Sequence, residues 1–224
     1  NQETPVIKAT INDSIPVDLF FDTGHSGGII IDSDKLYEKL IKTDSIKYLK
    51  YTSIPSIKIR GESEDIIQSL VYQAKFNIGA IQTDALNINV RISKQREFHG
   101  FIGNSFLQDY IVTLDYTKKR IGFIKQPISE THSNYTFGIN YTVTENKMIV
   151  SVVYDNSQAD KLGIVPGDEL YSINGIRISE IKDLCAIYRK EFSFISEHDS
   201  ILNLEIIRDG KKIKHELNQY LRFD

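Results

Sequence analysis

Tryptophan is absent from this chain of 224 residues, and cysteine and methionine occur once each. The single cysteine, Cys185, excludes an internal disulfide bond. No apolar run approaches the length of a membrane span, and a net charge of −3 lacks the basic excess that nucleic-acid binding uses. The histidines show no metal-ligand spacing, so we expect no metal site and no cofactor.

What is present is an ordinary globular mixture, with 41% hydrophobic and 25% charged residues. The length predicts one or two domains. A polar, Pro-containing stretch without apolar periodicity predicts a linker at 127–134, between regions 1–126 and 135–224. Because the chain opens at Asn1 without Met, we expect either a removed N-terminal segment or an excised fragment.

One acidic residue stands between two apolar runs near the N-terminus. Pro16–Phe21 is mostly apolar and delivers Asp22 into a Thr-Gly turn, and Ile29–Ile31 forms the next apolar run. A carboxylate at the end of a buried strand is costly to ionise unless neighbouring donors solvate it. Such an arrangement indicates a site for chemistry, although the triplet alone also fits an ordinary turn between two strands.

The Asp-Thr-Gly triplet, with apolar residues before it and Ser26 after it, resembles the active-site loop of pepsin- and retropepsin-like aspartic peptidases. The resemblance implies that Asp22 is a catalytic carboxylate. It further implies that Thr23 offers a hydroxyl to an opposite lobe, that the Gly24 amide lies close to the carboxylate, and that Ser26 braces the loop.

A second segment, Gly100–Leu107 followed by Tyr110–Tyr116, is similar to the closing segment of bacterial retropepsin-like lobes. In those folds an apolar-apolar-Gly element passes beside the catalytic loop, and here that element is Phe101-Ile102-Gly103. Ile102 and Gly103 would therefore support the Asp22 loop, with glycine required because backbone packs against backbone.

Two residues depart from the family pattern. His25 stands where the family usually has Ala or Ser, and the sequence leaves open whether its imidazole alters the field at the site or faces solvent. Arg60–Ser63 contains Gly61, the sole glycine between residues 28 and 79, and is our candidate for the tip of a substrate-covering flap.

The Asp-Thr-Gly triplet occurs once, although aspartic peptidases use two carboxylates that share a proton. The partner carboxylate must come from a second copy of the chain or from an upstream lobe. We expect the upstream lobe in preference to a homodimer, and hence a chain that is monomeric and inactive by itself. If neither partner exists, the lobe is a non-catalytic peptide-binding scaffold.

The C-terminal region resembles a PDZ domain over roughly 132–220. The signals are a short helix capped at Ser157, a helix stop at Gly163, a Pro-Gly-Asp turn and an Asn-Gly hairpin turn at Asn174. PDZ domains add a peptide strand to a sheet edge and hold its terminal carboxylate with backbone amides. The resemblance assigns this role to five residues: Tyr135, Thr136, Phe137, Gly138 and Ile139.

The sequence thus predicts a mainly β protein, with one retropepsin-like lobe followed by a PDZ domain built as a small β-barrel with two helices. The function implied is hydrolysis of peptide bonds by an aspartic-type endopeptidase, with a peptide or protein as substrate. The PDZ domain would bind peptide termini, regulate access, or only pack on the lobe. Similar bacterial proteins are exported, so the resemblance implies a periplasmic or cell-surface location.

Overall fold

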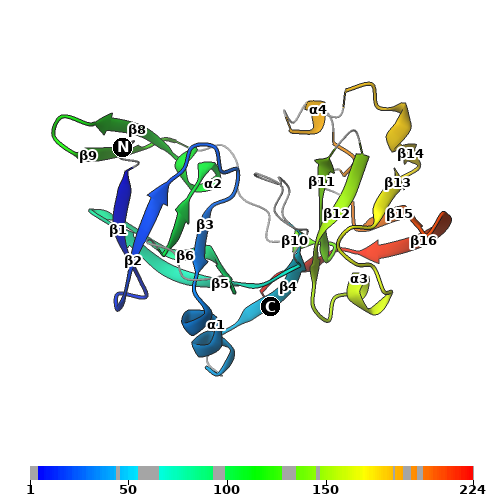
Figure 1. Ribbon diagram of the computed structural model, residues 1–224, viewed down its shortest axis with the longest axis horizontal. Coiled ribbons are helices and arrows are strands. Elements are labelled where there is room, and N and C mark those ends of the chain that lie inside the picture. Colours follow the sequence, from blue (N-terminus) through cyan, green and yellow to red (C-terminus); the bar gives the residue numbers. More distant parts are fainter. Residues whose placement is uncertain are drawn as a thin grey trace. The chain divides into compact units, whose positions relative to one another are not determined.

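A computed structural model describes residues 5–43, 46–54, 66–92, 99–127, 135–144, 147–183, 185–188, 193–195 and 199–223. The protein is mainly β and folds as two compact units (Figure 1). The first unit comprises Asn1–Tyr48 and Ser69–Ser133, and the second comprises Leu49–Gln68 and Asn134–Asp224. Among the described residues, no helix has both the length and the apolar character to cross a membrane.

The first unit is a β-barrel, closed because β1 pairs with β2 at one side and with β5 at the other. The strands run around the barrel in the order β1 (Val6–Ile11), β2 (Ile15–Phe21), β7 (Gly100–Ile102), β3 (Ile29–Asp32), β6 (Ile81–Arg91) and β5 (Ile67–Ile78). Its other elements are α1 (Asp34–Ile41), α2 (Asn104–Leu107) and the hairpin of β8 (Tyr110–Asp115) and β9 (Arg120–Lys125).

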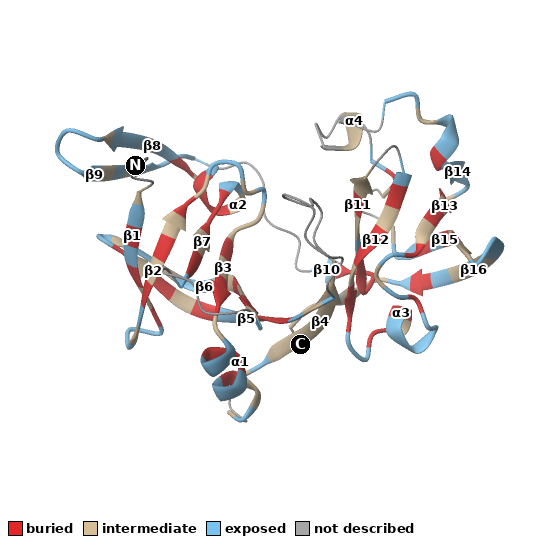
Figure 2. Ribbon diagram, viewed as in Figure 1, coloured by how far each residue is buried: buried red, intermediate tan, exposed pale blue. Residues whose placement is uncertain are grey.

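Alternating side chains fill the barrel, as the period of two along a strand requires (Figure 2). In β1 and β2 the inward residues include Ile11 and Leu19, both fully buried. Helix α1 begins at Asp34, after Ser33, whose hydroxyl accepts a hydrogen bond from the Leu36 amide at 3.2 Å. That helix covers the barrel with Leu36, Tyr37 and Leu40.

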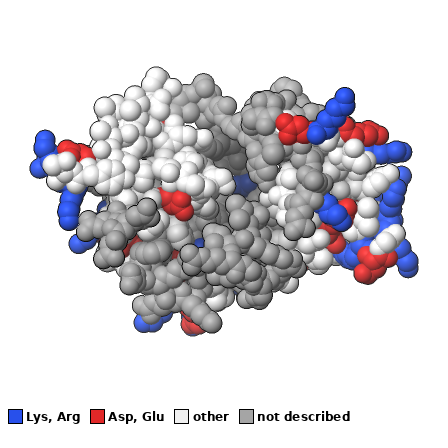
Figure 3. Space-filling view, turned by 45° about the horizontal axis from the view of Figure 1, so that its top comes forward, with Lys and Arg blue, Asp and Glu red and all other residues white. Residues whose placement is uncertain are grey.

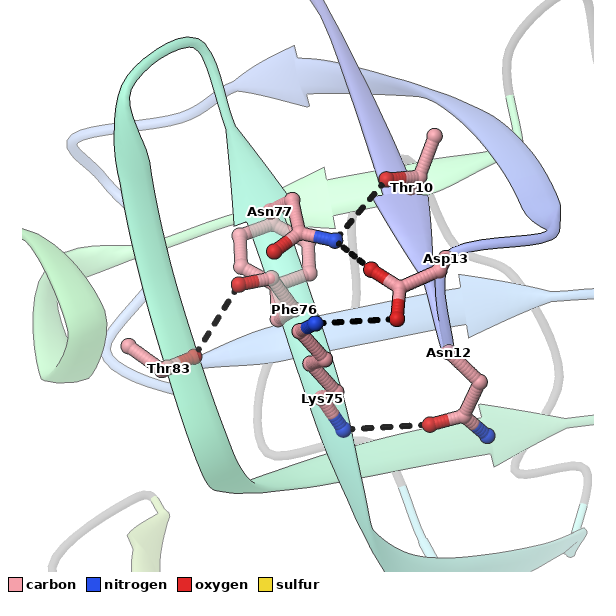
Figure 4. Close-up of polar contacts among 7 residues, drawn as sticks. All are labelled: Thr10, Asn12, Asp13, Lys75, Phe76, Asn77 and Thr83. Atoms are coloured by element: carbon pink, nitrogen blue, oxygen red, sulfur yellow. Dashed lines mark hydrogen bonds and ion pairs between the residues drawn. The ribbon is translucent and has the colours of Figure 1, made fainter.

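The turn between β1 and β2 fastens the barrel where β1 meets β5 (Figure 4). Asn12 and Asp13 adopt the left-handed conformation, with φ of 49° and 57°. The Asn12 and Lys75 backbones are joined by Asn12 N–H donating to Lys75 O at 2.9 Å. The Asp13 carboxylate accepts from Lys75 Nζ at 2.9 Å and from Asn77 Nδ2 at 2.7 Å. Polar contacts outside the core therefore support barrel closure.

The second unit is a β-sheet of antiparallel strands with a short two-stranded sheet beside it. Its elements are β4 (Tyr48–Ser53), β10 (Tyr135–Thr136), β11 (Ile139–Thr144), β12 (Lys147–Tyr154), α3 (Gln158–Lys161), β13 (Glu169–Ile173), β14 (Ile176–Arg177), η1 (Ile178–Glu180), α4 (Cys185–Tyr188), β15 (Ile201–Arg208), β16 (Lys211–Asn218) and β17 (Tyr220–Leu221). The strand order is β4-β12-β13-β15-β16, with β11 on β12, β14 on β13, and β10 paired with β17.

The local signals that predicted this unit are confirmed. Ser157 caps α3 by accepting from the Asp160 amide at 3.1 Å, and Gly163 ends that helix with φ of 75°. Asn174 and Gly175 both have positive φ, as the predicted hairpin turn requires. A separate apolar core includes the fully buried Met148. On the face drawn in Figure 3, basic side chains of described residues lie among acidic ones. Lys214 pairs with Glu205 at 3.1 Å.

Strand β4 belongs to the second unit, although the sequence analysis placed all of 1–126 in one region and predicted no strand at 48–53. Thr52 lies opposite Val153 on β12. The pairing continues beyond β4, because Ile54 N–H donates to Ser151 O at 3.0 Å. An edge of β12 is thereby covered by a strand that lies far away in the sequence. Residues 128–134 of the predicted linker and the predicted flap tip 60–63 lie outside the described residues.

Candidate functional site

Asp22 follows β2 directly, and its backbone is fixed by the neighbouring strand β7. The Asp22 amide donates to the Ile102 carbonyl at 3.1 Å, so the predicted adjacency of this residue to Phe101-Ile102-Gly103 is present. The Gly24 amide donates to Asp22 Oδ1 at 2.9 Å. The Gly24 amide thereby fixes the orientation of a partly buried carboxylate.

Strand β7 lies between β2 and β3, the two strands that the Asp22 loop connects. It runs parallel to β2, with Phe21 opposite Ile102, and antiparallel to β3, with Ile29 opposite the same residue. Ile102 is fully buried. A Cβ on Gly103 would lie 2.5 Å from the Gly27 carbonyl oxygen, so only glycine fits where the loop crosses the end of β7. The predicted supporting role of these two residues agrees with this packing.

Thr23 and Ser26 are exposed on the loop. The Thr23 carbonyl accepts a hydrogen bond from Asn104 Nδ2 at 2.5 Å, and the Asn104 amide donates to the His25 carbonyl at 2.8 Å. The bracing that the sequence analysis assigned to Ser26 is thus supplied by Asn104, the first residue of α2. Sequence reasoning missed Asn104 because an Asn after a glycine usually signals nothing more than a bend.

His25 points inward, which settles the alternative that the sequence left open. Its Nε2 atom is buried, and its ring lies 6.3 Å from that of Phe101. Burial is the main cause that lowers the pKa of His25 from its ordinary value of 6.5, the Asp22 carboxylate opposes this shift, and Arg91 reinforces it. The Nε2 atom of the imidazole therefore faces the protein and not solvent.

Arg91 is a cation that acts on this region. It holds the buried Asp32 carboxylate at two points, with Nε on Oδ1 at 2.7 Å and Nη2 on Oδ2 at 3.0 Å. Its guanidinium also lies 5.9 Å from the ring centre of Phe101. Asp32 is thereby committed to an ion pair between β3 and β6, which leaves Asp22 as the loop carboxylate suited to chemistry.

The predicted peptide site lies at the start of β11 in the second unit. Tyr135 is exposed, whereas Thr136, Phe137 and Ile139 are each 6% exposed. Gly138 has φ of 86°, and a Cβ there would lie 2.8 Å from the Ser157 side chain, so glycine is required on both counts. The structure thus brings all five predicted residues together in one turn beside α3.

The Gly138 amide in this turn already makes a hydrogen bond. Gly138 N–H donates to the buried Thr136 hydroxyl at 3.1 Å, and the Gly138 carbonyl accepts from the Tyr154 amide at 2.9 Å. A terminal carboxylate would have to displace the Thr136 hydroxyl to reach the Gly138 amide. Within the described residues, β11 pairs with β12 on one side and with no strand on the other. That second edge is where an added strand would bind.

Comparison with known proteins identifies part of this second unit. No curated protein matches the chain. A family model described as a PDZ domain matches residues 149–191, which run from β12 through the capped helix α3 and the Asn174-Gly175 turn to α4 and beyond. The chain therefore contains a PDZ domain within its second unit.

Proposed function

We propose that the chain is part of an aspartic-type endopeptidase, in which Asp22 is one of two catalytic carboxylates and the PDZ domain binds peptide segments. The observation that carries the proposal is the placement of Asp22. It stands at the end of a barrel strand, receives the Gly24 amide, and belongs to a loop that β7 holds at Ile102 and Gly103. A rigid scaffold around a partly exposed carboxylate is what acid–base chemistry requires.

The proposed chemistry needs a second carboxylate facing Asp22, supplied by another lobe or by a second copy of the chain. Two carboxylates that face each other closely share one proton, because both cannot be ionised together. The ionised member takes a proton from a water molecule, which attacks the scissile carbonyl carbon. The protonated member gives its proton to the carbonyl oxygen. The exposed Thr23 and Gly24 lie on the side of the loop that remains open to such a partner.

A cleavage assay tests the proposal on the protein as its native cells assemble it. With denatured casein as the probe, we expect cleavage at acid to neutral pH that is lost in Asp22→Asn, because the amide keeps the shape but does not titrate. Asp18→Asn is the matched control. Asp18 lies on β2, the strand that Asp22 follows. It bonds His99 through its own backbone, because its amide donates to His99 Nδ1 at 3.0 Å and its carbonyl accepts from the His99 amide at 2.8 Å. Undiminished cleavage in Asp22→Asn would overturn the assignment.

A second candidate function is peptide binding without catalysis, and the PDZ domain itself favours it. In this case the barrel is a scaffold and the open edge of β11 is the working surface. Tyr154 N–H donates to Gly138 O, and successive residues of an antiparallel strand bond to alternate sides, so the Ile139 amide faces the edge away from β12. Ile139→Pro would remove that backbone donor, with Ile139→Ala as the control for the lost side chain. If peptides bind with equal affinity to the wild type and to Ile139→Pro, the β11 edge is not the binding surface. Retained binding with no cleavage by any assembly would favour this second function.

A further inference from the structure

The imidazole of His25 occupies a slot between two glycines of the candidate site. A Cβ built on Gly27 would lie 2.6 Å from His25 Nε2, and a Cβ on Gly103 would lie 2.6 Å from His25 Cδ2. The ring of Phe101 lies beside the same imidazole. The ring is therefore wedged between the returning part of the loop and the end of β7.

The backbone of His25 connects this wedge to the catalytic candidate. Its amide donates to the Asp22 carbonyl at 3.2 Å, and its carbonyl accepts from the Asn104 amide at 2.8 Å. Gly24, whose amide donates to the Asp22 carboxylate, is the residue immediately before His25. A displacement of the imidazole would thus act directly on the backbone that orients Asp22.

The slot suits a neutral ring better than a charged one. Nε2 is buried and has no hydrogen-bond partner among the described residues. A neutral imidazole can leave that nitrogen as an unprotonated acceptor, whereas an imidazolium would bury an N–H donor without an acceptor, which costs more free energy.

The charged groups around the slot are few. Asp22 on the loop favours the imidazolium. Arg91 on β6, which is itself paired with Asp32 on β3, disfavours the imidazolium. β7 and α2 bring Phe101, Gly103 and Asn104 to the ring, and none of these residues titrates. Burial, the largest of the effects on His25, also lowers its pKa.

We propose that His25 is a positioning residue for the Asp22 loop: its neutral imidazole wedges the loop against β7, and protonation of the ring releases the loop. The site would then lose its ordered loop below the pH at which His25 takes up a proton. The inference rests on the proposed function only in giving the loop a catalytic task, because the positioning itself can be measured without any activity.

Proton titration of the whole 224-residue chain by NMR tests the proposal. Asp22→Asn provides the cleanest background, because it removes the titration of the loop carboxylate itself. We expect the His25 ring to titrate below 6.5, and the backbone amides of residues 22, 24 and 104 to shift with the same midpoint. Because Asp22 raises the pKa of His25, the ring midpoint should be lower in Asp22→Asn than in the wild type.

In the Asp22→Asn background, His25→Phe keeps a ring of similar volume that cannot take up a proton, so the loop amides should lose this pH-dependent shift. His99→Gln, a change at an exposed histidine of the same unit, should leave the shift intact. A ring midpoint at or above 6.5, or loop amides that still shift in His25→Phe, would overturn the proposal. If His25→Phe does not fold, the wild-type and Asp22→Asn titrations decide alone.

The outcomes also separate this inference from the peptidase proposal. Coupled titration of ring and loop without cleavage by any assembly would retain the positioning role and remove the peptidase. If cleavage depends on Asp22 but the loop amide shifts do not follow the titration of His25, the peptidase proposal is retained and the positioning role is lost.

Discussion

The two units leave different parts of their backbone open. In the first unit β1 pairs with both β2 and β5, so the sheet closes and its candidate site lies on a loop between two strands. In the second unit β11 pairs on one side only within the described residues, so its candidate site is a strand edge. A closed barrel removes edges, whereas an open edge can accept another strand. The comparison teaches that these two units suit different tasks: a fixed side chain for chemistry in one, and backbone recognition in the other.

The two units also share one structural feature, a buried ion pair. Each contains a buried aspartate that a partly exposed arginine holds at two points, Asp32 with Arg91 in the first and Asp168 with Arg208 in the second. Asp168 additionally accepts from the Val165 amide at 2.9 Å. Because removal of the aspartate leaves the arginine without its partner carboxylate, we expect each unit to be sensitive at its pair.

The largest expected effect is therefore loss of the Asp168 carboxylate. Asp168→Ala should destabilise the second unit by about 3 kcal/mol, because it orphans the arginine and the Val165 amide together. Asp32→Ala should cost the first unit less, because among the described residues only Arg91 bonds that carboxylate. Denaturant unfolding followed by NMR signals from each unit measures both. A greater loss from Asp32→Ala would break the comparison.

A proline in β4 should come next in size. Thr52 sits opposite Val153 between two bonded pairs, so its amide belongs to the ladder with β12. Thr52→Pro removes that donor and should destabilise the second unit by about 2 kcal/mol. Signals from the barrel should keep their unfolding midpoint, although residue 52 lies among barrel residues in the sequence. Destabilisation of the barrel instead would show that β4 is assigned to the wrong unit.

A smaller effect is expected at the turn before β11. Thr136→Val removes the hydroxyl that occupies the Gly138 amide. Peptides with free C-termini should then bind about fivefold more tightly, while the same peptides with amidated C-termini should not gain. Fluorescence polarisation with matched acid and amide peptides measures the difference. An equal change in affinity for both forms would show that the peptide carboxylate does not bind at this site.

The smallest effect concerns the exposed network that fastens the barrel. Hydrogen bonds from Lys75 and Asn77 lower the pKa of Asp13 from its ordinary value of 3.8. Asp13 therefore stabilises the folded barrel fully above 3.8, and this contribution is lost as the pH falls through the lower, folded pKa. Asp13→Asn, which tolerates the positive φ of 57° at this position, should slightly destabilise the first unit at neutral pH, and its difference from the wild type should disappear in strong acid. A difference independent of pH would mean that the charge plays no part.

The sequence was informative where structure depends on neighbours in the chain. The cap at Ser157, the stop at Gly163 and the turn at Asn174 follow from local turn and capping chemistry, and all are present. The contact between Asp22 and Ile102 was expected from a resemblance that joins two distant segments. These features need only short patterns or a known pair of segments.

The features that escaped prediction depend on partners far apart in the sequence. Residues 48–53 carry no signal for pairing with β12, because the pairing uses backbone groups that every residue has. The inward position of His25 depends on Gly27 and Gly103 together, and the second of these lies 78 residues away. Asn104 likewise acts on the loop through contacts that exist only after β7 is in place.

We propose that the barrel carries the chemistry and that the second unit carries peptide recognition. The most direct measurement follows both properties in one variant, using the native assembly with and without Asp22→Asn. The account predicts that cleavage of casein is lost while peptide binding by the PDZ domain keeps its affinity, because the substitution changes one titrating group in the barrel alone. Cleavage that persists in Asp22→Asn would contradict it.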